Sequence, residues 1–352
     1  MGAMTIIGTG SYAPGVPIPN AALARVMDTN DAWIRQRTGI EQRHFARDGE
    51  TVSELGAHAA RRALRSAGIT AAEVDYIVFG TMTPEYAFPG PGGLLGAKLG
   101  IEGVPALDLR QQCASAPFGL QVANGLLASD AARTVLFVCA EAHAGFMPWR
   151  DWDVVRGEST REVAEEDYAR ATRHRGVAIL FGDGASAMVL RHTTRDGAGF
   201  LGAECHSDGA RADLMYMPGG GFTRLPFFSL DVIEFELCYP QMRGPELFKS
   251  AVTELAGVVR SLCARHHVAL DEIDCVVAHQ ANDRINSAVR KALGLPPEKV
   301  PSNIARYGNT SSATVGILLD ELRADGRVKE GDLICVVALG AGLHWGAALL
   351  RL

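Results

Sequence analysis

Residues 104–131 read VPALDLRQQCASAPFGLQVANGLLASDA, and they place Cys113 where a predicted buried strand turns into a predicted helix. The strand is expected over 106–109. Pro117, which is tolerated in the first turn of a helix, precedes apolar residues at helical spacing through 127. A thiol near a helix N-terminus meets unpaired N–H groups and the positive end of the dipole, which favour the thiolate. Cys113 is therefore a candidate nucleophile, although a cysteine taken alone is more often a small buried apolar side chain.

The composition predicts a folded chain from a reducing compartment. Its 352 residues are 47% hydrophobic and 21% charged, which suits two domains or one large duplicated domain. Seven cysteines without a C-x-x-C pair argue against a disulfide framework or a zinc site, and no metal site is expected. A net charge of -6 argues against general nucleic-acid binding. The sequence has no signal-peptide pattern and no long apolar run, so we expect a cytoplasmic protein without a membrane span.

The rest of the chain alternates predicted strands and helices, with one long interruption. Strands are expected over 5–8, within 71–84 and over 134–142, and helices over 20–27 and 51–66. Residues 143–176 are charged and aromatic without a strand pattern, so we expect a surface excursion with a helix near 161–172. Residues 177–191 are expected to form paired strands around a Gly-Asp-Gly turn, and 207–240 to be rich in loops.

The second half of the sequence repeats the first. The corresponding segments are 71–80 with 270–279, 104–116 with 300–312, and 181–191 with 339–351. Such a duplication of alternating strands and helices implies two α/β halves, 1–192 and 193–352, related by an approximate two-fold axis. Cys113 and Asn309 each stand nine residues after the valine that opens their segment, so the helix N-termini that carry them would approach each other. His279, at the end of strand CVVAH, would reach the same place.

Motifs along almost the whole chain resemble those of the β-ketoacyl-acyl-carrier-protein synthase III family, in the thiolase superfamily. In the family's order they are IIGTGSYAP, DAWIRQRTGIEQRHFA, FGDGASA, MRGPELFKSAV, VVAHQANDRI, RYGNTSSAT and GAGLHWG. The resemblance implies a thiolase-like duplicated fold in an α-β-α-β-α layered arrangement. It also implies an acyltransferase that joins an acyl group to a malonyl thioester, in fatty-acid, polyketide or related secondary metabolism.

The same resemblance implies roles for three side chains. Cys113 would attack an acyl thioester, and the backbone N–H groups of Cys113 and Ala341 would hold the oxyanion. A malonyl thioester would then lose carbon dioxide, and its enolate oxygen would accept hydrogen bonds from His279 and Asn309 before the enolate attacks the acyl-cysteine. Each residue alone also has a structural explanation, since His279 would suit a core and Asn309 would suit a helix N-cap.

Further residues match the family's binding positions. The resemblance implies coenzyme A contacts at Trp33, Arg37, Arg175, Gly176, Phe248, Ala281 and Asn282. It also implies an acyl-carrier-protein docking contact at Arg284, and a homodimer in which Phe88 closes the acyl pocket of its partner. No tightly bound cofactor is expected, because the coenzyme A thioester is the substrate.

The sequence departs from the family's pattern near the expected tunnel. His344 stands where the family usually has threonine, and the chain is longer than typical members before Arg175 and before Phe248. The alternative is a non-condensing acyltransferase that passes the acyl group to a hydroxyl or amine, with His279 as general base. A thiolase is disfavoured because GAGLHWG lacks a second cysteine. A catalytically silent subunit is disfavoured because Cys113, His279 and Asn309 are all present.

Overall fold

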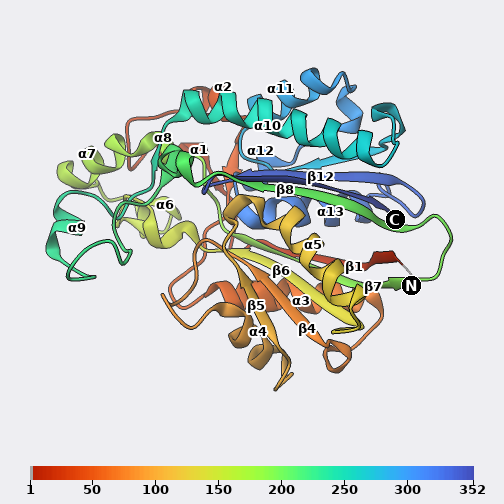
Figure 1. The fold of residues 1–352 in the computed structure, drawn as a ribbon. Helices are drawn as coiled ribbons and strands as arrows, with labels where there is room; N and C mark the ends of the chain where they lie inside the picture. Colours follow the sequence, from red (N-terminus) through yellow and green to blue (C-terminus); the bar gives the residue numbers. More distant parts are fainter. Residues whose placement is uncertain (1–2) are drawn as a thin grey trace.

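The computed structural model describes residues 3–352, and a five-stranded sheet forms the core of its first half (Figure 1). The strand order is β1-β7-β6-β4-β5. The strands span Ala3–Tyr12 (β1), Gly184–Thr193 (β7), Thr134–Glu141 (β6), Tyr76–Gly80 (β4) and Ala106–Leu109 (β5). β4 is parallel to β5 and β6, whereas β7 is antiparallel to both β6 and β1. β6 is buried along its whole length, as expected of a strand covered on both faces.

A second sheet repeats this arrangement in the other half. Its order is β11-β12-β13-β8, with strands at Cys275–Ala278 (β11), Leu333–Gly340 (β12), His344–Arg351 (β13) and Gly199–Ser207 (β8). β11 and β12 are parallel, and β13 is antiparallel to both β12 and β8, as β7 is to β6 and β1. The predicted duplicated α/β fold is therefore confirmed. The boundary drawn between 192 and 193 stays a prediction.

Helices separate and cover the two sheets in five layers (Figure 1). The outer pairs are α3 (Val52–Ala67) with α4 (Pro91–Leu99), and α10 (Gly244–Arg265) with α11 (Asp283–Leu293). The middle pair is α5 (Ser115–Ala128) and α13 (Thr314–Ala324). Both middle helices are largely apolar and contribute buried side chains to one cluster that also contains residues of both sheets. The two halves therefore share a core, and the N-terminal ends of α5 and α13 meet inside it.

The backbone corrects the residue-by-residue match between the halves. Gln112 and Ser311 are non-glycine residues with positive φ, 53° and 47°, and each opens a short 3-10 turn that leads into a middle helix. Cys113 is thus equivalent to Ser312, and Asn309 lies three positions before it. The sequence match placed Asn309 opposite Cys113 because it aligned the preceding valines. The segment before Ser311 folds differently, as the short helix α12 (Ile304–Tyr307) instead of a strand.

Two local expectations on the N-terminal side are also corrected. β5 is a strand as predicted, but residues 106–108 are exposed because β5 is the last strand in its sheet's order and pairs only with β4. The helix expected over 20–27 is the single turn α1 (Asn20–Leu23), followed by turns. Helix α2 (Asp31–Thr38) then ends at Gly39, whose φ of 78° terminates it. The short strands β2 (Ile18–Pro19) and β3 (Gln42–Arg43) pair beside these helices.

The segment 143–176 lacks strands, as predicted, but it is more than a surface excursion. It contains α6 (Trp152–Val155) and α7 (Glu165–Arg173), the latter near the predicted helix. Met147, Trp149 and Val154 are buried in a cluster formed with residues 18–45, so the segment builds a small core of its own. Its charged residues other than the buried Asp151 are exposed or half-buried, and they obscure the apolar pattern in the sequence. Residues 177–181 continue from α8 (Arg175–Ala178) and do not form the predicted strand.

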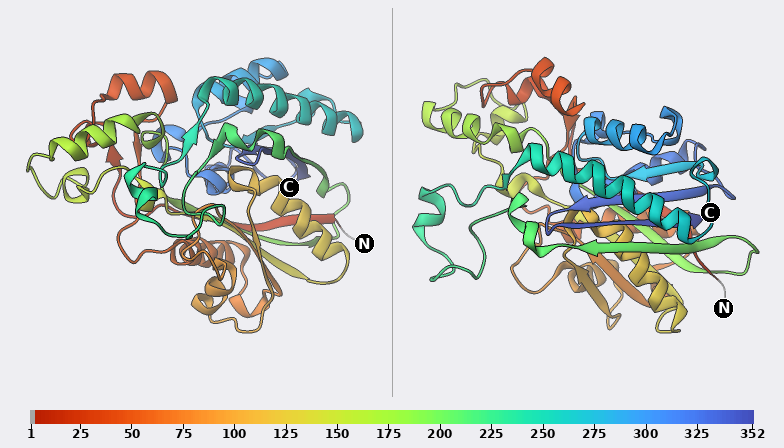
Figure 2. Two further views of the ribbon diagram at one scale, coloured as in Figure 1. Left: turned by 60° about the vertical axis from the view of Figure 1, so that its left-hand side comes forward. Right: turned by 45° about the horizontal axis from the view of Figure 1, so that its top comes forward.

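Residues 207–240 are rich in loops, as predicted, and part of them projects from the body of the protein (Figure 2). The projecting part includes α9 (Leu230–Glu234), and Phe222 and Phe228 are exposed. The short strands β9 (Met215–Tyr216) and β10 (Gln241–Met242) pair at its base. Within residues 3–352, no helix is long and apolar enough to cross a membrane.

Candidate active site

Cys113 lies in the turn between β5 and α5, as the sequence predicts. The turn spans Gln112–Ala114, α5 begins at Ser115, and the cysteine is buried. Gly340, the last residue of β12, packs directly on this turn. A Cβ atom at Gly340 would stand 2.8 Å from the backbone nitrogens of Cys113 and Ala114, so only glycine fits there. Ala341, the next residue, therefore follows directly on the contact with the cysteine turn.

Ser311 makes the closest polar contact to the thiol, and the sequence analysis missed it. Its Oγ lies 3.1 Å from Cys113 Sγ and 3.2 Å from Met82 Sδ. Its positive φ is a conformation that costs free energy for a non-glycine residue, and such strain clusters at functional sites. The contact crosses between the two halves, so local sequence patterns do not reveal it. The serine in the GNTS motif was the available signal.

The same turn orients the side chain of Asn309. Its Oδ1 accepts a hydrogen bond from the backbone N–H of Ser311 at 2.8 Å. Its own backbone N–H donates to Leu180 O at 2.8 Å, and its carbonyl accepts from Gly182 N–H, which anchors the residue to the first half. Because Oδ1 is occupied, the Nδ2 group is the one available to a ligand, and it is a donor.

His279 follows the last residue of β11, and its ring is buried. Its Nδ1 lies 2.6 Å from Thr314 Oγ1, at the first turn of α13. Burial lowers the pKa of His279 to about 3, because a charged imidazole loses its hydration there. At neutral pH the ring is therefore uncharged, and its single N–H proton is on either Nδ1 or Nε2.

The electrostatic surroundings of Cys113 oppose ionisation of the resting thiol. Burial raises the pKa of Cys113 to about 12, the hydrogen bond from Ser311 counteracts this, and the carboxylate of Glu141 adds to it. Glu141 ends β6 and is fully buried. It accepts hydrogen bonds from Thr81, Met82 and Thr83 of the first half and from Ser312 of the second. The sequence analysis also missed this carboxylate, which ties the two halves together beside the thiol.

A cavity of about 720 Å³ collects most of the predicted site residues. Its lining includes Cys113, His279 and Asn309 together with Trp33, Arg37, Gly176, Phe248, Ala281, Asn282 and Arg284. Three predicted site residues, Arg175, Ala341 and Phe88, are not part of this lining. Met215 and Met242, from the paired short strands β9 and β10, also line it. The cavity therefore joins a buried nucleophile to a rim of aromatic and basic side chains.

Trp33 lies at this rim close to two guanidinium groups. The Arg37 guanidinium lies 4.3 Å and that of Arg175 5.0 Å from the centre of the indole ring system, within cation–π range. Arg175 also pairs with Asp28 at 2.8 Å. The three side chains combine an aromatic ring with positive charge, a combination that suits a nucleotide with phosphate groups.

Phe88 and His344 lie outside the cavity. Phe88 is 79% exposed in the single chain, so it closes no pocket of its own subunit. His344 Nδ1 lies 2.7 Å from Ser207 Oγ, and its ring packs edge-on against Phe118. The structure thus gives His344 a structural contact between β13 and β8. Among residues 3–352, no group of His, Cys, Asp and Glu side chains is arranged to hold a metal ion.

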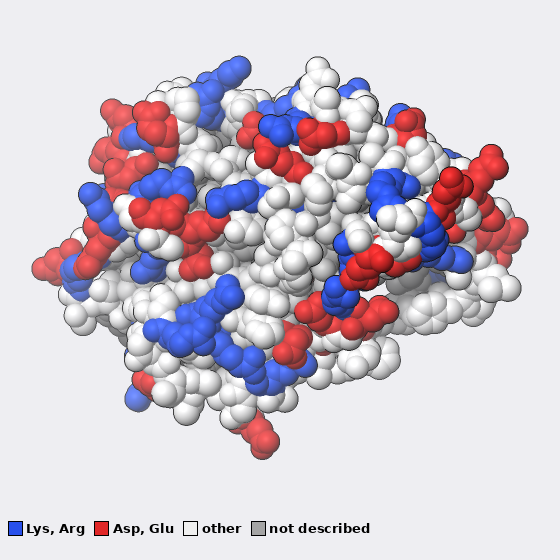
Figure 3. All heavy atoms as spheres, turned by 180° about the vertical axis from the view of Figure 1, so that it is seen from behind, with Lys and Arg blue, Asp and Glu red and all other residues white. Residues whose placement is uncertain are grey.

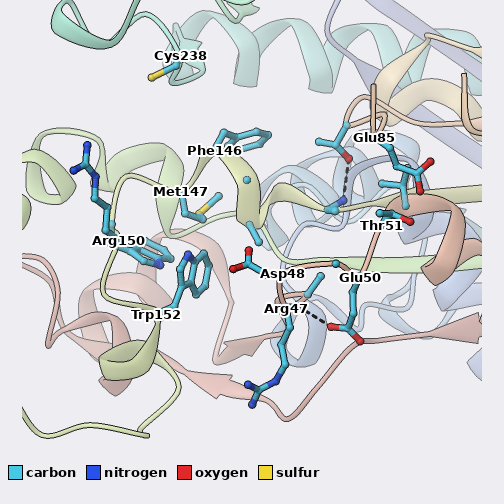
Figure 4. Close-up of a pocket in the computed structure, with 18 of the residues that line it drawn as sticks. Arg47, Asp48, Glu50, Thr51, Glu85, Phe146, Met147, Arg150, Trp152 and Cys238 are labelled. Atoms are coloured by element: carbon cyan, nitrogen blue, oxygen red, sulfur yellow. Dashed lines mark hydrogen bonds between the residues drawn. The ribbon is translucent and has the colours of Figure 1, made fainter. Parts of the chain in front are cut away.

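A second cavity, of about 850 Å³, lies next to the segment 143–176 and contains none of the predicted site residues. Phe146, Met147 and Trp152 line it from that segment, and Glu85 lines it from another loop (Figure 4). The segment 143–176 therefore shapes this neighbouring cavity, and only its last residue, Gly176, lines the cavity of Cys113.

Comparison with known sequences gives a consistent picture. Residues 107–209 match the family model described as 3-oxoacyl-[acyl-carrier-protein (ACP)] synthase III, and residues 263–352 match that of its C-terminal part. The β-ketoacyl-[acyl-carrier-protein] synthase III of Rhodospirillum rubrum is 42% identical over 352 residues, covering 99% of this chain and 98% of its own. That of Rhodobacter capsulatus is 37% identical over 348 residues, covering 98% and 97%.

Solved structures agree with the sequence comparison. The 3-oxoacyl-[acyl-carrier-protein] synthase III of Aquifex aeolicus superposes with a TM-score of 0.84 at 35% identity, covering 99% of this chain and 100% of its own. The priming β-ketosynthase of the R1128 polyketide pathway gives 0.83 at 29% identity, covering 99% and 96%. Fold, site and full-length similarity together show that this chain belongs to the β-ketoacyl-acyl-carrier-protein synthase III family of acyltransferases.

Proposed function

We propose that this member of the family loads an acyl group from acyl-coenzyme A onto Cys113 and condenses it with a malonyl thioester, releasing carbon dioxide and a β-ketoacyl product. One observation carries the proposal: Cys113, His279 and Asn309 line a single cavity whose rim holds Trp33 and Arg37. The nucleophile and the donors for an enolate thus share a space with a nucleotide-sized aromatic and basic rim.

In the first step, the sulfur of Cys113 forms a bond to the thioester carbonyl carbon, and the bond to the coenzyme A sulfur breaks. The cysteine proton leaves with coenzyme A as its thiol. The backbone N–H groups of Cys113 and Ala341 hold the oxyanion of the tetrahedral intermediate. The packing of Gly340 on the backbone of the cysteine turn supports this pairing, because Ala341 is the next residue along the chain.

In the second step, the malonyl thioester loses carbon dioxide, and its enolate carbon forms a bond to the acyl carbon. The bond from that carbon to Cys113 Sγ then breaks, and the released thiolate takes up a proton from solvent. The enolate oxygen accepts hydrogen bonds from His279 and from Asn309 Nδ2. Both donors are uncharged, because burial keeps His279 as a neutral imidazole and Asn309 Nδ2 belongs to an amide. The Asn309 oxygen already accepts the backbone N–H of Ser311, which leaves Nδ2 for the enolate. Decarboxylation supplies the carbanion, so no base has to remove a carbon-bound proton.

The rim of the cavity suits the two carriers of the substrate. Trp33, Arg37 and Arg175 would bind the nucleotide of coenzyme A, which is a substrate, and no tightly bound cofactor takes part.

Arg284 would contact the acyl carrier protein. Charges of both signs are interspersed over much of the rear face, with one group of Lys and Arg at its lower left, and the whole chain carries a net charge of -6 (Figure 3). Attraction of an acidic carrier therefore depends on local residues such as Arg284.

The proposal includes a homodimer that pairs along β5. This strand has a single neighbour in its sheet, and Leu107 on it is 38% exposed. A free edge of this kind is suited to pairing with a second copy. Phe88 precedes the helix that packs beside β5 and would reach the partner's acyl pocket. Light scattering should give the molar mass of a monomer for Leu107→Glu. Val16→Glu, at another exposed apolar position, should keep the molar mass of the dimer. A monomeric wild type would contradict the proposal.

Intact-protein mass spectrometry tests the whole scheme. Incubation with a series of acyl-coenzyme A thioesters should add the acyl mass to the wild type and to Cys139→Ala, another buried cysteine, but not to Cys113→Ala. Malonyl carrier protein should then remove the added mass with release of carbon dioxide. If the acyl mass stays after this chase and a hydroxyl or amine acceptor removes it, the non-condensing acyltransferase replaces the proposal. No mass gain with any donor would refute the nucleophile.

A further inference from the structure

The two ring nitrogens of His279 face different partners. Nδ1 contacts Thr314 Oγ1 at 2.6 Å, and His279 also lines the cavity of Cys113. Nε2 is therefore the nitrogen left for a ligand. A neutral imidazole carries one proton, so the hydrogen bond at Nδ1 determines whether Nε2 meets a ligand as a donor or as an acceptor.

The hydroxyl of Thr314 has two possible acceptors and one proton. It lies 3.0 Å from the carbonyl oxygen of Ser311 and closer, at 2.6 Å, to Nδ1 of His279. The Ser311 carbonyl already accepts the backbone N–H of Thr314, which closes the 3-10 turn before α13. The contact to Nδ1 is the shorter by 0.4 Å, and the carbonyl keeps its backbone partner whichever way the hydroxyl points, so Nδ1 is the better acceptor for the hydroxyl proton.

We propose that Thr314 is a positioning residue that donates its hydroxyl proton to His279 Nδ1 and so holds the imidazole in the tautomer with its proton on Nε2. This inference rests on the proposed condensing function and adds to it a residue that acts through His279. The equivalent control of Asn309 comes from the same turn, where the Ser311 N–H occupies Oδ1 and leaves Nδ2 as the donor. Residues 309–314 thus determine which atom of each side chain can donate to the enolate. The Ser311 N–H does this for Asn309, and Thr314 does it for His279.

The choice of tautomer separates the two chemistries that share these side chains. With its proton on Nε2, His279 donates to an enolate oxygen, as condensation requires. With its proton on Nδ1, the same ring would present a lone pair to the cavity, as a general base for a hydroxyl or amine requires. Thr314 therefore favours condensation over transfer to a hydroxyl or amine.

The test compares Thr314→Val, which removes the hydroxyl at similar volume, with Thr314→Ser, which keeps it. Thr310→Val is the matched control, because Thr310 is also buried and its hydroxyl has no hydrogen-bond partner. In protein labelled with nitrogen-15 histidine, the His279 signals are assigned by their absence from His279→Gln. The wild type, Thr314→Ser and Thr310→Val should show the proton on Nε2. Thr314→Val should show a shift toward the Nδ1 tautomer.

The kinetic measurement separates the two half-reactions. In Thr314→Val, release of carbon dioxide from the malonyl thioester should fall about ten- to hundredfold, the scale known for residues that orient a metal-binding histidine through its other ring nitrogen. Acylation of Cys113 should change less than threefold, and Thr314→Ser should restore the malonyl step. A wild-type Nδ1 tautomer, or an unchanged malonyl step in Thr314→Val, would overturn the inference. Absence of carbon dioxide release by the wild type would instead refute the proposed function, and the tautomer measurement would still report on Thr314.

Discussion

Removal of the Ser311 hydroxyl should slow the reactions of Cys113 by an amount that follows from its contact. A hydrogen bond to a charged acceptor contributes about 1.5–3 kcal/mol, and one pKa unit corresponds to about 1.4 kcal/mol. Loss of the 3.1 Å contact to Sγ should therefore raise the pKa of Cys113 by about one to two units in Ser311→Ala. The thiolate becomes rarer but more nucleophilic, with a Brønsted coefficient of about 0.5. The net loss in rate is about three- to tenfold.

The assay is alkylation of Cys113 by iodoacetamide between pH 6 and pH 9, followed by intact mass, with Cys113→Ala as the blank. Burial keeps the pKa of Cys113 above this range, so the rate should rise about tenfold per pH unit in both proteins. The line for Ser311→Ala should lie three- to tenfold lower throughout. Ser311→Gly, which favours the positive φ, should be equally slow. A rate equal to wild type in both variants, or a loss in the alanine variant alone, would refute the role of the hydroxyl.

Three further predictions test the rim, the core and the buried imidazole. Trp33→Ala should raise KM for acyl-coenzyme A about tenfold in steady-state kinetics, which is the scale of one aromatic stacking contact. KM for a truncated acyl thioester that lacks the nucleotide should not change. An equal increase in KM for both substrates would show that Trp33 does not bind the nucleotide. Gly119→Ala would place a Cβ 2.2 Å from the Phe137 ring. The free energy of unfolding in urea should therefore fall by about 1–3 kcal/mol, although alanine has the better helix propensity. A variant more stable than the wild type would contradict this packing. In the unfolded chain His279 takes up a proton near pH 6.5, whereas in the folded protein its pKa is about 3. The free energy of unfolding should therefore fall by about 1.4 kcal/mol per pH unit as the pH drops between these values. In His279→Gln, a plot of the free energy of unfolding against pH should be flatter by this amount, and parallel plots for the two proteins would disprove the burial effect.

Much of the fold was predictable because its signals are local and repeated. A turn that joins a strand to an apolar helix placed Cys113 at the start of α5, where the structure has it. The repeated segments led to the prediction of two α/β halves, since equivalent strands in the two sheets carry similar sequences. The segment 143–176 was harder, because its buried residues pack against residues 18–45, and no periodicity within the segment records that contact.

The sequence by itself determined which residue types are present and where each lies relative to a strand or helix end, so Cys113, His279 and Asn309 were found. Only the tertiary structure decided the contacts that cross between the halves. Examples are the Ser311 hydroxyl on the thiol and the buried carboxylate of Glu141, which bridges both halves. The physical reason is that hydrogen bonds act over about 3 Å in space. Residues nearly two hundred positions apart come within that distance only when the two middle helices share one core.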